Sequence, residues 1–255
     1  MAVEYARRGL VGVLTPQANT TVEPECAILW PPGIAMLNAR LTSDKPTIIA
    51  RLLDYLRDLP GAARQFANAP IAALAFACTG ASYFAGAAEE DALVARMQDA
   101  LGIPVITAAT AVRDAFHAVG AVRIGLVSPY PDDLTDAATH YWAERGFTVA
   151  AISRGAMSDG AFHPIYAMSA AGAAAALAAL PEAGYGAVAL LGTGMPTLKP
   201  ILDRPFHHGA PVTSCMHALV WRCTRAVDGL PADRESFLDF VRGDEWRGRY
   251  AARMG

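Results

Sequence analysis

The chain has 255 residues, of which 53% are hydrophobic and 18% charged, and its formal net charge is −3. A chain this apolar is not intrinsically disordered, and four cysteines in this length are too few for a disulfide-stapled scaffold. The balance of 21 basic and 24 acidic residues argues against a nucleic-acid or membrane-surface partner. The length suits one large domain or two lobes of roughly 100–130 residues each.

Short apolar runs alternate with longer amphipathic stretches, which is typical of parallel βαβ units. The order of strands and helices in the first half begins again near residue 123. The predicted strands cover residues 10–14, 71–77, 104–108, 123–127, 148–152, 187–191 and 211–214. The predicted helices cover residues 47–68, 89–101, 111–119, 133–145, 171–181 and 216–227.

Two uncharged or nearly uncharged stretches are poor candidates for membrane spans. Residues 71–88 are at the length limit and rich in small and polar residues, and residues 168–180 are too short. Residues 1–14 lack the apolar core and cleavage site of a signal peptide. These features predict a cytoplasmic protein with free thiols and no membrane partner.

The two halves of the sequence resemble one another at three places that occur in the same order. Near residue 10, "GLVGVLTPQANTTVEPE" corresponds to "RIGLVSPYPDDLTDAA" near residue 123. Near residue 72, "AALAFACTGAS" corresponds to "AVALLGTGMPT" near residue 187. Near residue 103, "IPVITAATAVRDAF" corresponds to "APVTSCMHALVWRC" near residue 210. Each match is weak alone, but a nearly constant offset over three matches indicates a duplication.

The duplication predicts an α/β fold of two pseudo-twofold-related Rossmann-like lobes, each with a mainly parallel sheet flanked by helices. We expect residues 1–117 plus 218–255 to form the first lobe and residues 118–217 the second. In such folds ligands bind at the carboxyl ends of the strands. The active site is therefore expected in the cleft between the lobes.

Cys78 is the strongest candidate for a reactive side chain. It lies at the end of a predicted strand, where backbone N–H groups and a helix start are expected to lower the pKa of its thiol and favour the thiolate. The alternative is a small cysteine buried in the core. The repeat pairs Cys78 with Gly192, so only one side of the cleft carries a thiol at this position.

Other residues near the predicted cleft suit the binding of a carboxylate or oxyanion. Gly192, Thr193 and Gly194 combine small side chains with exposed N–H groups, although the same residues also suit a plain tight turn. Asn19 and the threonines after it either donate hydrogen bonds to a carboxylate or cap a helix. The hydroxyl of Tyr130 either reaches the cleft or its ring packs in the core.

The remaining cysteines and histidines are weaker candidates. No pair has the spacing of metal ligands. Cys215 and His217 follow a predicted strand end, which leaves open whether they border the cleft. His207 and His208 are expected in an exposed loop. The sequence has neither a phosphate-binding loop nor a dinucleotide fingerprint, so no cofactor and no metal are expected.

At these residues the sequence resembles the aspartate/glutamate racemase superfamily, and more closely its branch of maleate cis-trans isomerases and arylmalonate decarboxylases. "TPQANTTVEPE" is similar to the first loop of the isomerases, which assigns substrate-carboxylate binding to Asn19. "ACTGASYFAG" resembles the decarboxylases' loop, with Cys78 in place of a glycine. "SPY" carries the cleft tyrosine onto Tyr130. "LLGTGMPTL" matches the second cysteine loop of both groups, with Gly192 in place of the cysteine.

The resemblance implies a cofactor-independent enzyme that acts on a small dicarboxylic acid. The racemases and isomerases use a cysteine in each lobe, and the decarboxylases use only the second, whereas this chain keeps only Cys78. The favoured hypothesis is arylmalonate-type decarboxylation to an enediolate, which Cys78 protonates on one face. The groups expected to stabilise the enediolate are Thr79, Tyr130 and the N–H groups near Gly80, Thr193 and Gly194.

Two other functions stay open on the sequence. In maleate-type cis-trans isomerisation, the Cys78 thiolate adds to the alkene, the bond rotates, and elimination gives the trans acid. The third hypothesis is that the protein binds dicarboxylates without turning them over. The sequence fixes neither the substrate nor the oligomeric state, and a homo-oligomer is compatible with it.

Overall fold

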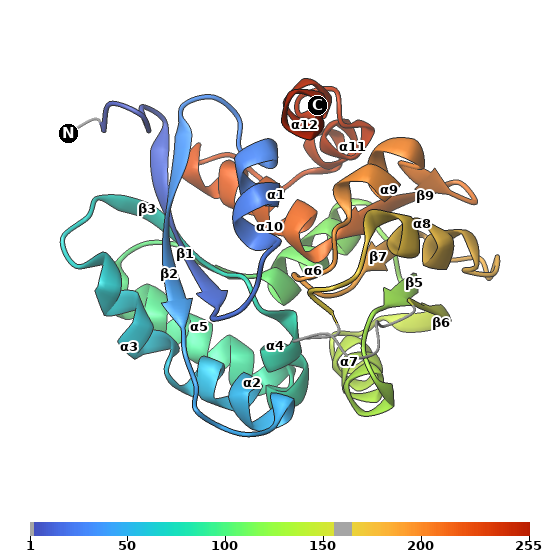
Figure 1. Cartoon of the computed structure of the whole chain (residues 1–255), viewed down its shortest axis with the longest axis horizontal. Helices are drawn as coiled ribbons and strands as arrows, with labels where there is room; N and C mark the ends of the chain where they lie inside the picture. The colour runs from blue at the N-terminus through green and yellow to red at the C-terminus, as the bar shows by residue number, and fades with distance from the viewer. Residues whose placement is uncertain (1–2, 156–164) are drawn as a thin grey trace.

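The computed structural model describes residues 3–155 and 165–255 and contains two sheets that lie side by side (Figure 1). The four strands of the first sheet are parallel, in the order β2-β1-β3-β4. They are β1 (Gly9–Pro16), β2 (Ile34–Leu41), β3 (Ile71–Phe76) and β4 (Val105–Thr107). The second sheet has the order β6-β5-β7-β9-β8, and only β8 is antiparallel. Its strands are β5 (Arg123–Ser128), β6 (Thr148–Arg154), β7 (Ala187–Leu190), β8 (Phe206–His207) and β9 (Ala210–Ser214).

The two sheets share one strand order, because β6-β5-β7-β9 repeats β2-β1-β3-β4. The three matched sequence segments contain β1 and β5, β3 and β7, and β4 and β9, which are equivalent strands in this order. The predicted α/β fold of two mainly parallel sheets flanked by helices is thus confirmed. Strands such as β3 and β7 read as unbroken apolar runs because both faces of a parallel sheet are covered.

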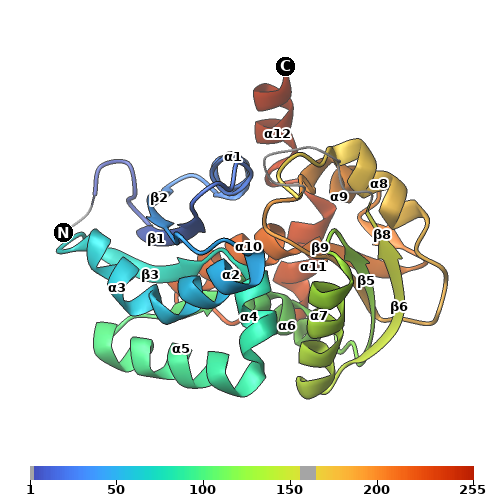
Figure 2. The same ribbon diagram turned by 60° about the horizontal axis from the view of Figure 1, so that its bottom comes forward.

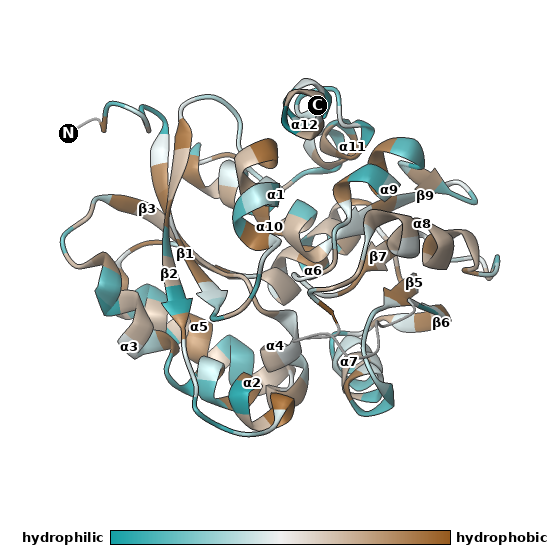
Figure 3. Cartoon of the chain, viewed as in Figure 1, coloured by the Kyte–Doolittle hydropathy of each residue, from teal (hydrophilic) through white to brown (hydrophobic). Residues whose placement is uncertain are grey.

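Helices cover both sheets, and helices such as α7 and α12 are more hydrophilic than strands such as β3 and β7 (Figure 3). The C-terminal helix α12 projects from the body and buries none of its residues (Figure 2). The helices of the first half are α1 (Val22–Leu29), α2 (Ile48–Arg57), α3 (Leu59–Ala63), α4 (Thr79–Ala85), α5 (Ala87–Leu101) and α6 (Ala108–Ala118). The later helices are α7 (Asp132–Glu144), α8 (Ala170–Ala178), α9 (Leu198–Asp203), α10 (Cys215–Val227), α11 (Arg234–Arg242) and α12 (Arg247–Met254).

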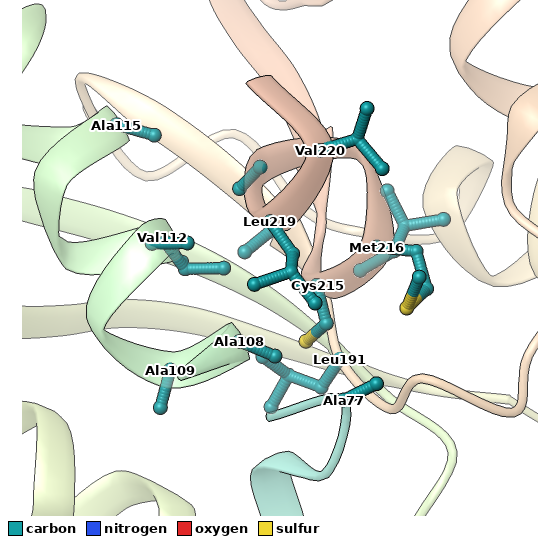
Figure 4. Packing of buried hydrophobic residues seen from close by; sticks show 14 of the residues in the cluster. Ala77, Ala108, Ala109, Val112, Ala115, Leu191, Cys215, Met216, Leu219 and Val220 are labelled. Carbon is teal, nitrogen blue, oxygen red and sulfur yellow. The ribbon is translucent and has the colours of Figure 1, made fainter. Parts of the chain in front are cut away.

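Helix α10 links the two sheets. It follows β9 of the second sheet and packs against α6, α1 and β3 of the first half. Figure 4 shows this packing, with Cys215 and Leu219 of α10 against Ala108 and Val112 of α6. The α10 contacts agree with a chain that returns to the first lobe near residue 218, and the lobe boundaries themselves stay a prediction.

The single helix predicted over residues 47–68 is wrong. Helix α2 ends at Arg57, and the chain continues as α3 and a short 3₁₀-helix, Arg64–Phe66. Pro60 explains the break, because proline has no N–H to continue the hydrogen bonds of α2. The predicted helix over residues 111–119 begins earlier, at Ala108, because Thr107 and Thr110 form a capping box.

Several elements were not predicted at all, and they share weak patterns. The strand β2 is an edge strand with an irregular mix of buried and exposed residues, and α11 and α12 are short and polar. The uncharged stretch 71–88 folds as β3, the short helix α4 and the start of α5.

Within the described residues, no helix is long and apolar enough to cross a membrane.

Candidate active site

A narrow cavity of about 40 Å³ lies where the loops after β3, β5 and β7 meet. It collects every site residue predicted from the sequence except Asn19. Those that line it are Cys78, Thr79, Gly80, Tyr130, Gly192, Thr193 and Gly194. Larger surface hollows of about 730 and 570 Å³ lie along α10–α12 and between α2 and α5, and none of these residues lines them.

Cys78 directly precedes the first turn of α4 and is 4% exposed. The expected lowering of its thiol pKa is wrong. Burial raises the pKa of Cys78 to about 12, although the backbone N–H groups of Ala81 and Gly80 act in the opposite direction. The start of α4 thus lowers the thiol pKa as predicted, but the loss of water around the buried sulfur raises it by more. Cys78 is consequently a neutral thiol near pH 7.

Thr79 and Tyr130 join the two halves of the chain across the cavity. The Thr79 Oγ1 and Tyr130 hydroxyl oxygens are 2.9 Å apart. Arg154 donates to the Tyr130 carbonyl oxygen at 3.1 Å, and the Ser128 hydroxyl accepts from the Tyr130 N–H at 3.3 Å. Burial raises the pKa of Tyr130 well above its usual value. Its hydroxyl therefore reaches the cavity as a neutral hydrogen-bonding group.

The loop that contains Gly192 has a backbone suited to glycine. Gly192 has a φ of +85°, and a Cβ atom built on it would lie 2.9 Å from Pro129 Cγ and 3.3 Å from the Tyr130 hydroxyl oxygen. A Cβ on Gly194 would lie 2.4 Å from the ring of Tyr166. A cysteine at position 192 therefore does not fit this loop conformation without movement of the backbone or of Pro129.

Asn19 lies outside the set that lines the cavity and connects the two lobes. Its Oδ1 accepts from the N–H groups of Thr21 and Val22 at 2.9 and 3.2 Å, and its Nδ2 donates to Thr193 Oγ1 at 3.2 Å. Thr193 in turn donates to the Ala77 carbonyl oxygen at 2.9 Å. The polar atoms of Asn19 are thus engaged within the protein, and its predicted contact with a substrate carboxylate stays a prediction.

Cys215 does not line the cavity, but its thiol contacts two residues that do, Thr79 and Gly192. It is fully buried, and burial raises its thiol pKa to about 11, offset by hydrogen bonds from Thr79 and from the Gly192 N–H. Figure 4 shows it at the start of α10, with its sulfur toward the chain segments of Ala77 and Leu191. The thiol thus packs beneath the residues that form the cavity.

His207, His208 and His217 are not among the residues that line the cavity. His217 contacts Thr213 Oγ1 and the Phe240 carbonyl oxygen, and burial lowers its pKa to about 4. The expected exposed loop at His207 is wrong, because this residue is 3% exposed and its Nε2 lies 3.0 Å from the Leu180 carbonyl oxygen. In the described part of the chain, no three histidine, cysteine or carboxylate side chains are placed to hold a metal ion.

One wall of the cavity is apolar and was missed by sequence reasoning. Ile48 and Leu52 of α2 supply part of it, and no arginine, lysine or histidine of the described residues lines the cavity. The spacing of apolar residues in α2 was a usable signal, whereas Ile165 and Tyr166 lie outside any regular element and gave none. The other members of this wall are Pro16, Leu134, Ile165 and Tyr166.

The family model of arylmalonate decarboxylase matches residues 11–236. The chain belongs to the arylmalonate decarboxylase family. The chain is 26% identical to arylmalonate decarboxylase from Bordetella bronchiseptica over 239 residues, which is 89% of this chain and 94% of the relative. It is 30% identical to a maleate isomerase from Pseudomonas putida over 157 residues, which is 54% of this chain and 60% of that protein.

Solved structures show the same fold. The maleate isomerase Iso from Pseudomonas putida S16, in a cysteine-to-alanine variant with maleate, superposes with a TM-score of 0.79 at 23% identity and covers 92% of this chain and 98% of its own. The two curated relatives are thus a decarboxylase and an isomerase. The family therefore indicates an enzyme of one of these two kinds, and the roles of Cys78 and its neighbours stay predictions.

Proposed function

We propose that this protein is a cofactor-independent decarboxylase of malonate-type dicarboxylic acids, in which Cys78 protonates one face of the enediolate. The observation that carries the proposal is the state of the thiol. A cysteine with a pKa of about 12 is a proton donor near neutral pH, and it lies beside neutral hydrogen-bond donors and an apolar wall. Together these groups match the needs of a decarboxylation.

The first step breaks the bond between the α-carbon and one carboxyl group. Its electron pair passes into the remaining carboxyl group, which becomes an enediolate, and neutral CO₂ leaves. Leu52 and Leu134 supply an environment that disfavours a charged carboxylate and accepts CO₂. The hydroxyls of Thr79 and Tyr130 and the loop N–H groups of Thr193 and Gly194 would stabilise the negative charge of the enediolate.

The second step transfers the Cys78 proton to the α-carbon. The thiolate left behind accepts hydrogen bonds from the N–H groups of Gly80 and Ala81, the same groups that lower its pKa. Water restores the proton after product release. Because Gly192 supplies no second acid, protonation on a single face would give one product enantiomer.

The experiment that tests this proposal is the chiral analysis of the acid formed from a prochiral 2-aryl-2-methylmalonate. The expected result is CO₂ release with one enantiomer in excess. Cys78→Ala should lower turnover about 10²–10⁴-fold, and Cys223→Ala, which removes a buried thiol that does not line the cavity, should retain it. A racemic product, an absence of CO₂ release, or full activity in Cys78→Ala would each overturn the proposal.

Maleate-type isomerisation is the second candidate, because the chain is 30% identical to a maleate isomerase over part of its length. That reaction needs the Cys78 thiolate as nucleophile. With a pKa of about 12, the thiolate fraction at pH 7 is roughly a thousandfold below that of an ordinary cysteine. We therefore expect slow alkylation of Cys78 by iodoacetamide at pH 7 and a rate that still rises at pH 10.

Fast alkylation that levels off near neutral pH, together with conversion of maleate to fumarate, would favour the isomerase. A protein that only binds dicarboxylates would instead show saturable binding of both acids with neither CO₂ release nor fumarate. The alkylation rates are to be compared with Cys78→Ala, which reports the reaction of the three other thiols.

A further inference from the structure

A second small cavity adjoins the one that contains Cys78. Three residues, Ile48, Leu52 and Tyr166, line both cavities. The two spaces therefore share a wall made of these three residues. The outer cavity is also lined by Gln17, Ala18, Arg51 and Tyr55. A substrate in the inner cavity would direct its α-substituent along the shared wall toward these residues.

Arg51 is the only charged residue among those that line the outer cavity in the described part of the chain. Its Nε donates to the Lys45 carbonyl oxygen at 2.6 Å, and no described residue accepts a hydrogen bond from its two terminal nitrogens or forms an ion pair with it. Asp54, one turn further along α2, is bound to Arg57 and to the Ser43 hydroxyl instead. Toward the described residues, the guanidinium thus leaves most of its hydrogen-bonding capacity unused.

Tyr55 connects the outer cavity with the reactive thiol. It is 5% exposed, and burial raises its pKa, while the nearby charge of a Cys78 thiolate raises it further and that of Arg51 lowers it. Its hydroxyl is therefore within electrostatic reach of both groups. This links the cationic end of the outer cavity to the place where the proposed chemistry occurs.

We propose that the outer cavity is a substrate subsite in which Arg51 binds a carboxylate at the far end of the α-substituent. The proposal rests on the function proposed above. It assigns the substrate to malonate-type acids whose side chain is apolar where it passes Ile48 and Leu52 and anionic at its end. A planar guanidinium matches a carboxylate with two parallel hydrogen bonds, which is the strongest such pairing in proteins.

Isosteric pairs of 2-methyl-2-alkylmalonates test the subsite. Each pair has a side chain of two to four carbons that ends either in a methyl group or in a carboxylate. Binding is measured by calorimetry on Cys78→Ala, in which turnover is expected to be slow, and kcat and KM are measured on the unmodified chain. We expect at least one carboxylate-ended acid to bind about tenfold or more tightly than its methyl-ended partner.

The matched variants are Arg51→Gln and Arg64→Gln, since Arg64 is exposed and lines neither cavity. Arg51→Gln should remove the preference through KM while leaving the methyl-ended acids unchanged, and Arg64→Gln should retain it. Equal binding within every pair, or a preference that survives in Arg51→Gln, overturns the subsite. CO₂ release without a preference for the carboxylate-ended acids would overturn the subsite alone. Preferential binding of these acids without CO₂ release would support the subsite and overturn the proposed decarboxylase activity.

Discussion

The loops that carry Cys78 and Gly192 are equivalent by sequence and by strand order, but they differ in backbone conformation. Both follow a central strand of their sheet and line the same cavity. Cys78 has an extended backbone with a φ of −149°, which any residue adopts, whereas Gly192 has a φ of +85°. The absence of a thiol at position 192 therefore goes together with a loop conformation that does not suit a side chain. The asymmetry of the site lies in the backbone as well as in the side chains.

Of the changes that test the difference between the two loops, removal of the Cys78 thiol from the first loop should have the largest effect, a loss of activity. Cys78→Ala should lower kcat about 10²–10⁴-fold, as expected for loss of a general acid. Substrate affinity should change little, because the thiol is not among the groups expected to hold the carboxylate. Steady-state kinetics together with calorimetric binding separate the two effects. Equal losses in kcat and affinity would instead indicate a collapsed cavity.

Glu25 connects the first lobe to the segment that follows the Gly192 loop. Its carboxylate accepts from the Thr197 N–H at 2.7 Å, and burial raises its pKa to about 7 from 4.5. Between these values the folded chain retains a proton that the unfolded chain releases. The free energy of unfolding should therefore fall as the pH rises from 4.5 to about 7, by up to about 3 kcal/mol at about 1.4 kcal/mol per pKa unit.

Denaturant unfolding of the unmodified chain and of Glu25→Gln across this pH range measures the effect. The variant should lose the decline and should be the more stable protein at pH 8, because its amide stays neutral. Parallel pH profiles for the two proteins would show that Glu25 does not carry this pH dependence.

Adding a Cβ atom to the second loop tests the backbone difference directly. Gly192→Ala should destabilise the protein by about 1–3 kcal/mol, the usual cost of a side chain at such a φ. Gly192→Cys should cost about as much, because the Cβ and not the sulfur causes the strain. Chemical denaturation of both variants measures this. An unchanged midpoint for either would mean that the loop can accept a side chain at position 192.

The smallest effect is expected where Asn19 connects the loops. Asn19→Ala removes the cap on the N–H groups of Thr21 and Val22 and the bond to Thr193, at a cost of about 1–2 kcal/mol. Thr193→Val retains the cap and removes the contacts of Thr193 with Asn19 and with the Ala77 carbonyl oxygen. If the valine variant is as unstable as the alanine variant, the contact between the lobes matters more than the cap.

The duplication was readable from the sequence because it left matching apolar strands followed by matching loops. The position of Cys78 at a strand end and the grouping of Thr79, Tyr130 and Thr193 around one cavity follow from parallel topology alone. The strand β2 was missed because an edge strand buries only part of its residues and has no clear period.

Other features depend on long-range packing that no local pattern carries. The pKa of Cys78 follows the depth of burial, which depends on how the two lobes close over the sulfur. The placement of Tyr166 against Gly194 arises from a segment without regular structure. The position of Cys215 beneath Thr79 depends on the return of α10 to the first sheet.

The hydrogen bonds between the loops bear on how a substrate enters and leaves. Asn19 to Thr193, Thr193 to the Ala77 carbonyl and Thr21 to the Gly194 carbonyl all cross from one lobe to the other and are buried. A hinge motion that separates the lobes here would break all three, at roughly 3 kcal/mol if each contributes about 1 kcal/mol. We therefore expect exchange with solvent past the start of α2, where Ile48 lines the cavity and is 39% exposed. Substrate and product would then pass on the side of α2, while the hydrogen bonds between the lobes stay intact during turnover.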